Sequence, residues 1–252
     1  MGTSTIESRP VSDQRLREPA AEMAAVDAWK PLYLMAAGAA LLSIALIAVA
    51  AVVYPFNPIP TTIEGWFSLY RDNWLLGLIA ADLVMLVSYV LIGLIYFALY
   101  GALRRVNQPF MALATALEFV GMAAYFAANP AFSLLTLSNQ YATATTGTER
   151  GALLAAGQAV IANWTGTAFN VAYFLSAIAA IIVSVVMLRG NVFGKPTAYT
   201  GLAMGVLTLV PASAGMVGAI VSFVALVPTV IWFILLARRF FQLGGASQRS
   251  VG

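Results

Sequence analysis

The stretch WLLGLIAADLVMLVSYVLIGLIYFALYGAL (74–103), RRVNQ (104–108), PFMALATALEFVGMAAYFAA (109–128) decides the fold. Each of its two apolar blocks is long enough to cross a bilayer, because a transmembrane helix needs about 20 residues. The short link between the blocks carries Arg104 and Arg105, and Pro109 follows it. The stretch therefore predicts two antiparallel membrane-spanning helices joined by a tight basic turn.

Similar apolar blocks extend in both directions from this stretch. They lie at 31–54, 164–188, 198–213 and 216–237. The chain of 252 residues is 61% hydrophobic and 9% charged, whereas soluble domains carry roughly 25% charged residues. We predict an all-α integral membrane protein over 30–239, a six-helix transmembrane bundle with an extracytoplasmic helical loop between spans three and four. The block at 198–213 is short, so a re-entrant fifth segment stays open as an alternative.

The basic residues predict the orientation of these spans. With six spans both termini share one side, and 11 of the 13 Lys and Arg residues fall on that side. Arg71 and Arg150 fall on the other. Cytoplasmic loops carry the excess of basic residues, so both termini are expected in the cytoplasm. The charged stretch 1–29 predicts a disordered cytoplasmic tail, and 240–252 a second tail.

The stretch 129–163 is too polar for a span and predicts two surface helices over 130–161. Asn129-Pro130 is typical of a helix start. Thr146 and Glu149 have the spacing of a capping box, which indicates the start of the second helix. Two interpretations are open: the helices connect two spans, or they form a lid over a membrane pocket.

The same region carries a family resemblance. ANPAFSLLTLSNQYATATT (128–146) and ERGALLAAG (149–157) resemble a bacterial membrane protein family catalogued as domain of unknown function 4386. GTAFNVAYFL (166–175) and SVVMLR (184–189) are similar to it too. The resemblance implies a multi-span protein of the bacterial inner membrane. It implies no activity and no functional residues.

Two acids lie inside the predicted spans, and a charge there costs about 2.5–3.5 kcal/mol on insertion scales. Asp82 is expected about 12 Å and Glu118 about 15 Å below the outer boundary. The two could thus share a layer with Asn170 and Tyr173. Further hydroxyl groups come from Ser88, Tyr89, Thr115 and Tyr125. The functional interpretation is a proton-titrating or cation-binding pocket open to the outside. The alternative is that each acid is neutral and hydrogen-bonds a neighbouring helix.

Composition removes several kinds of chemistry. The chain has no Cys and no His, which excludes disulfides, thiolate nucleophiles and imidazole-ligated metals. It has no glycine motif for phosphates, and the mixed charges of its tails give no nucleic-acid footprint. We expect no cofactor, no metal and no nucleic-acid partner.

Three function classes remain. The favoured class is a protein that binds or transports a small apolar or cationic solute at the carboxyl site. The second is a non-catalytic accessory or scaffold subunit that packs with other membrane proteins, a second copy or lipids. An enzyme is least favoured, because no nucleophile is paired with an activating base.

Overall fold

The computed structural model describes residues 28–57 and 59–245, and over these residues the chain is helical, without strands. The all-α prediction is confirmed. The helices are α2 (Lys30–Phe56), α3 (Ile63–Asp72), α4 (Trp74–Ala80), α5 (Leu83–Ala128), α6 (Ala131–Thr143), α7 (Gly147–Trp164), α8 (Thr167–Arg189), α9 (Lys195–Thr208) and α10 (Gly215–Gly245). Most of the tail predicted at 1–29 lies outside the described residues. The tail predicted from residue 240 is helical up to Gly245.

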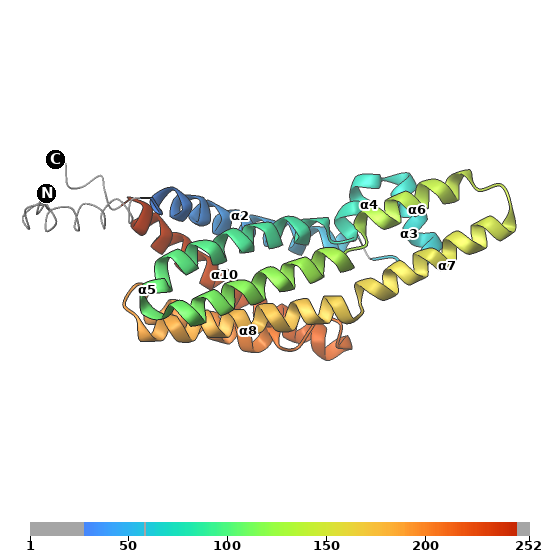
Figure 1. The fold of residues 1–252 in the computed structure, drawn as a ribbon. Helices are drawn as coiled ribbons and strands as arrows, with labels where there is room; N and C mark the ends of the chain where they lie inside the picture. The colour runs from blue at the N-terminus through green and yellow to red at the C-terminus, as the bar shows by residue number, and fades with distance from the viewer. Residues whose placement is uncertain (1–27, 58, 246–252) are drawn as a thin grey trace, which may run out of the picture.

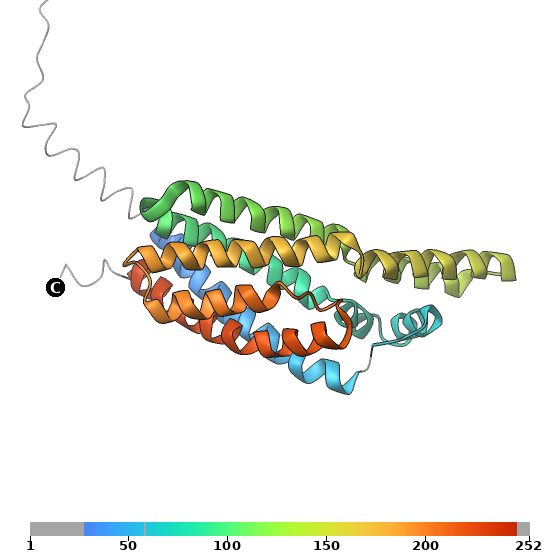
Figure 2. The ribbon, with the colours of Figure 1, turned by 90° about the horizontal axis from the view of Figure 1, so that it is seen from below.

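The helices form two regions. A bundle contains α2, α5, α8, α9 and α10. A smaller group, which we call the head, contains α3, α4, α6 and α7 (Figure 1). The head lies at the end of the bundle opposite the start of α2 and the end of α10, and in Figure 2 α7 leads into α8 with little change of direction. The two helices predicted over 130–161 are therefore present, as α6 and α7.

Helix α5 is a hairpin of two arms. The backbone leaves the helical region at Asn107 (φ −157°, ψ 91°), where the chain turns back on itself (Figure 1). The Asn107 side-chain oxygen accepts from the backbone N–H of Phe110, at 3.2 Å, which opens the second arm. Pro109 suits this place because the first helical turn does not use its missing N–H.

Within the described part of the chain, four helical stretches are long and apolar enough to cross a membrane, by length and composition. They are Lys30–Ala51, Leu83–Thr143, Gly147–Arg189 and Gly215–Gly245. The stretch Leu83–Thr143 includes both arms of α5. Large apolar side chains such as Phe223 (73% exposed) and Met216 (77% exposed) cover the outer surface of α10. These features are typical of a helical membrane protein.

One predicted helix is broken. The block 74–103 forms α4 and the first arm of α5, with Ala81 and Asp82 between them. Asp82 has a left-handed backbone (φ 69°, ψ 26°), and among the described residues it is the single non-glycine residue with positive φ. The carbonyls of Ala81 and Asp82 accept from the Asn129 side chain, at 3.4 and 3.5 Å. The break is therefore held by the far end of the other arm.

Helix α3 was not predicted, although its sequence carries the signals for it. The Thr62 hydroxyl caps it by accepting from the Gly65 N–H at 3.1 Å. Trp66, Phe67 and Tyr70 follow at helical spacing and are at most 3% exposed. They form the core of the head with Leu78 of α4 and Leu134 of α6, among others.

Two buried hydroxyls join α3 to α6. The Tyr70 hydroxyl donates to the carbonyl of Ala131 at 2.8 Å. The Ser138 hydroxyl donates to the carbonyl of Phe67 at 2.9 Å. Burial raises the pKa of Tyr70 above its ordinary value, because ionisation would place a charge in the core of the head.

Candidate functional site

Glu118 lies in the second arm of α5 and is 1% exposed. Among the described residues neither of its carboxyl oxygens has a hydrogen-bond partner. The sequence of this arm (108–128) and of α8 up to Leu188 contains no Lys or Arg. Burying an unpaired polar group costs about 2–7 kcal/mol, and an unpaired carboxylate costs far more than a neutral carboxylic acid. Glu118 is therefore a costly group at this position.

A hydroxyl beside this carboxyl comes from Ser176 of α8. Its Oγ is buried and, within the described chain, also lacks a hydrogen-bond partner. The close approach of the two helices depends on Gly121, one turn after Glu118. A Cβ at Gly121 would lie 3.3 Å from both the Ala172 carbonyl oxygen and Ser176 Oγ. The Glu118 carboxyl and the Ser176 hydroxyl thus lie beside each other at the contact between α5 and α8, without full hydrogen-bond geometry.

The first arm of α5 supplies two tyrosines to the same surroundings. Tyr89 (7% exposed) and Tyr96 (2% exposed) are buried and lie close enough to Glu118 for electrostatic interaction. Tyr89 interacts in the same way with Asp82. Tyr89 is therefore near both acids.

Asp82 lies at the open end of the α5 hairpin and has a different environment. Its carboxylate accepts a hydrogen bond from the Tyr125 hydroxyl at 3.0 Å. Tyr125 is 1% exposed. This bond and the contact from Asn129 hold the left-handed turn, which costs roughly 1–2 kcal/mol for an ordinary residue.

A series of aromatic rings lies beside the two acids. Tyr89 stacks on Tyr125, with ring centroids 4.4 Å apart. The ring centroids of Tyr125 and Phe169 are 6.0 Å apart, and those of Phe169 and Tyr173 are 4.9 Å apart. We call Tyr89, Tyr125, Phe169 and Tyr173 the tyrosine cluster. It lies between the α5 hairpin and α8, at the end nearest the head.

The structure separates residues that were expected in one layer. Asp82 bonds Tyr125, which lies seven residues beyond Glu118, or about 10 Å along the helix axis. The two acids are therefore at different levels, because the break at Ala81–Asp82 moves Asp82 to the end of the hairpin. Tyr173 and Tyr125 belong to the cluster as expected.

Asn170 forms its hydrogen bonds with groups other than the two acids. Its amide donates to the Gly166 carbonyl at 2.8 Å, and its oxygen accepts from Ser213 in the turn before α10. It joins α8 to that turn instead. The hydroxyls of Ser88 and Thr115 donate to carbonyls within their own helices.

Sequence reasoning missed Ser176, Tyr96 and Phe169. A serine in an apolar helix gives no signal of its own, since it commonly bonds the carbonyl four residues earlier. Its position one helical turn from Tyr173 was the available hint. Over residues 28–57 and 59–245, no three acidic side chains gather as ligands for a metal ion. A cation at this site would depend on a single carboxyl and neighbouring hydroxyls.

A comparison with protein-family models, curated proteins and solved structures found no match. The resemblance to domain of unknown function 4386 therefore stays a prediction. The function of this chain is inferred from its own residues and their geometry.

Proposed function

We propose that this chain is a six-span protein of the bacterial inner membrane that binds a proton at Glu118 and couples it to the binding or transport of a small apolar or cationic solute. In this proposal the spans are α2, the two arms of α5, α8, α9 and α10. The head then lies outside and both termini lie in the cytoplasm, which agrees with the distribution of Lys and Arg. Membership of the family that the sequence resembles belongs to the same proposal.

The observation that carries the proposal is the buried carboxyl of Glu118, which has no basic residue on its own arm of α5 or on α8 up to Leu188. Acidic groups at membrane depth are rare and are typical of ion or proton pathways. A structural acid is expected to have a strong hydrogen-bond partner, whereas within the described residues Glu118 has the nearby Ser176 hydroxyl, which does not reach full hydrogen-bond geometry. A carboxyl that takes up and releases a proton explains why an expensive group is retained here.

A series of hydroxyl groups supports exchange of that proton with the outside. Ser176 and Tyr89 lie next to Glu118, Tyr89 stacks on Tyr125, and the Tyr125 hydroxyl bonds Asp82. Each hydroxyl can donate and accept a hydrogen bond. Small rotations of these side chains would pass a proton between Asp82 at the end of the hairpin and Glu118.

A shallow groove supports an apolar solute. It has a volume of about 240 Å³ and is lined by Val90, Gly93, Leu94, Phe97, Phe119 and Met122. It runs between the two arms of α5, beside the residue that follows Glu118. Its lining is apolar, so an apolar group or a lipid chain fits it best.

Infrared spectroscopy of the protein in lipid tests the proton site directly. The parent should show a carboxylic-acid band that disappears on raising the pH, and Glu118→Gln should lack it. Glu64→Gln, which removes an exposed acid of the head, should keep the band. A Glu118 band that never changes with pH would reduce this acid to a packing role and refute the proposal.

Proteoliposomes with a trapped pH-sensitive dye test the coupling. An imposed pH gradient should decay faster with the parent than with Glu118→Gln, and Tyr125→Phe should lie between them. Equal decay for all three proteins would contradict a proton pathway through this cluster.

The accessory alternative rests on a different surface. The exposed apolar side chains of α10 include Met216, Ile220, Phe223 and Val227, which recur at helical spacing along one face. A partner helix or lipid could cover this face. Native mass spectrometry from lipid nanodiscs would favour the accessory role if the chain is found bound to another membrane protein through α10.

A further inference from the structure

We infer that the head contains a second binding site, for a short zwitterionic peptide, in the groove between α3 and α6. The groove has a volume of about 380 Å³, within the range of about 300–1,000 Å³ that is usual for ligand sites. It is distant in the fold from Glu118, so it does not depend on the proposed proton site.

The groove carries opposite charges. Glu64 and Arg71 both line it from α3, and they are seven residues apart. Seven residues of helix span two turns, about 10.5 Å, and place both side chains on one face. A tripeptide extends about 10 Å at about 3.3–3.6 Å per residue. Its ammonium and carboxylate ends would therefore reach Glu64 and Arg71.

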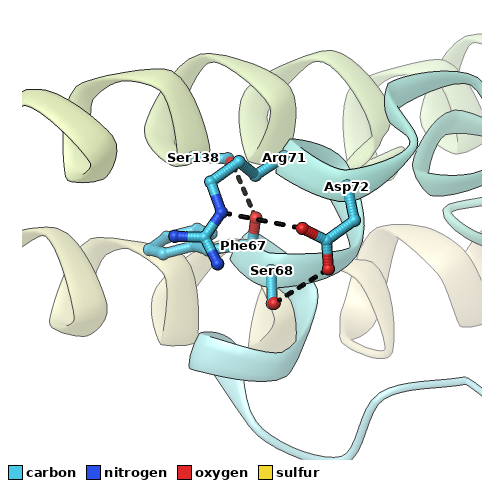
Figure 3. A network of polar contacts seen from close by, with 5 residues as sticks. All are labelled: Phe67, Ser68, Arg71, Asp72 and Ser138. Atoms are coloured by element: carbon cyan, nitrogen blue, oxygen red, sulfur yellow. Dashed lines mark hydrogen bonds and ion pairs between the residues drawn. The ribbon is translucent and has the colours of Figure 1, made fainter.

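Arg71 is available to a ligand. It is 66% exposed and its ion pair with Asp72 uses Nε, at 3.7 Å (Figure 3). An exposed pair of this kind contributes about 0–1 kcal/mol. A guanidinium binds a carboxylate through two parallel N–H bonds, which is a stronger contact. A peptide carboxylate can therefore replace Asp72 at little cost.

The walls of the groove are ordered and aromatic. The bond from the Ser138 hydroxyl to the Phe67 carbonyl fixes α6 against α3 on this face (Figure 3). Phe67 contacts Tyr141 with ring centroids 5.2 Å apart, and the Arg150 guanidinium lies 5.9 Å from the Tyr141 ring. Tyr141 thus presents a supported ring to the middle of a bound peptide. Arg71 lines the groove together with Tyr141, and Arg150 contacts the Tyr141 ring without lining the groove.

Calorimetry of the full chain in detergent, with trialanine as the probe, tests this site. The parent should bind one trialanine, and N-acetyl-trialanine and trialanine amide should each bind at least tenfold more weakly. Arg71→Gln should lose the discrimination against the amide, and Glu64→Gln the discrimination against the acetylated peptide. Asp72→Asn should tighten binding, because it removes the competing carboxylate.

Lys195→Gln, at the start of α9, is the matched control and should bind like the parent. The proposal is overturned if the folded parent does not bind trialanine at millimolar concentration, or if both groove variants bind it unchanged. Binding of dihexanoyl phosphatidylethanolamine in place of trialanine would assign the groove to a lipid headgroup and overturn it as well. Near-UV circular dichroism checks that each variant keeps its head folded.

Discussion

Among the described residues, buried hydroxyls that join helices are hydrogen-bonded in the head, whereas a buried carboxyl in the bundle lacks a clear hydrogen-bond partner. Each region also holds a buried tryptophan N–H without an acceptor, Trp164 in the head and Trp232 in the bundle. In the head, Tyr70 and Ser138 each donate to a carbonyl of a neighbouring helix. In the bundle, the Glu118 carboxyl and the Ser176 hydroxyl lie beside each other at a helix contact, without full hydrogen-bond geometry. A buried polar group with a hydrogen bond contributes to stability, whereas a buried polar group without one lowers the stability. The comparison therefore identifies Glu118 as the buried acid whose effect on stability the predictions below test.

The largest expected effect lies where the two regions meet. Asp82→Ala removes the acceptor of the Tyr125 hydroxyl and places alanine at φ 69°. The lost hydrogen bond and the backbone cost together should lower the free energy of unfolding by about 3 kcal/mol. Asp82→Asn keeps an acceptor and tolerates this backbone, so it should stay close to the parent. Unfolding in mixed detergent measures both, and equal losses would contradict this explanation of the turn.

Removing a satisfied group from the head should destabilise it. Tyr70→Phe leaves the buried carbonyl of Ala131 without its donor and should cost about 2 kcal/mol. Tyr199→Phe alters a tyrosine that is 58% exposed and is the matched control. Near-UV circular dichroism against temperature measures both. If the two variants melt together, the Tyr70 hydrogen bond is not structural.

Removing the buried Glu118 carboxyl from the bundle should have the opposite effect on the free energy of unfolding. Glu118→Leu replaces a buried, unpartnered carboxyl by an apolar side chain and should raise the free energy of unfolding by about 1.5 kcal/mol. Glu118→Gln keeps a polar group in the same place and should gain little. Steric trapping in lipid bicelles measures the difference. A destabilised leucine variant would show that Glu118 has a partner in the membrane.

The smallest effect is a pH dependence of the head. The folded pKa of Tyr70 is raised above 10.0 by burial, so the folded state is penalised relative to the unfolded chain once the pH exceeds 10. Its contribution to stability is complete below pH 10 and is lost as the pH rises towards the folded pKa. The parent should lose on the order of 1 kcal/mol more than Tyr70→Phe by pH 11. Parallel melts of the two proteins at pH 8 and pH 11 give this difference. Identical losses would mean that Tyr70 titrates as it does in the unfolded chain.

Much of the fold follows from apolar block length. The helices at Lys30–Phe56 and Thr167–Arg189 lie close to their predicted bounds, because long apolar runs and turn residues are local signals. The helix at Gly215–Gly245 begins close to where it was predicted but continues past the predicted end at residue 237. The break at Ala81–Asp82 has no such signal. Neither Gly nor Pro occurs there, and Tyr125 and Asn129, more than 40 residues away, hold it. Tertiary contacts of this kind cannot be read from one segment.

In the candidate site, too, local sequence signals identify some features and tertiary contacts determine the others. Glu118 was found because a single charge in an apolar run stands out. Its expected partner Asp82 was assigned to the wrong level, since depth was counted along a continuous helix. Ser176 was missed, because its role depends on the close approach of α8 at Gly121. The sequence therefore identifies the unusual residues of the site, but it does not show which residues are their neighbours in the fold.

The turn at Asn107 has a consequence for biogenesis. The connection between the two arms of α5 is too short to form a separate segment outside a bilayer. The arms would have to enter the membrane together, with all backbone groups bonded within each helix. Tyr125 would then be delivered beside Asp82 during insertion itself. A longer link at residues 104–108 should therefore slow assembly before it changes the finished structure.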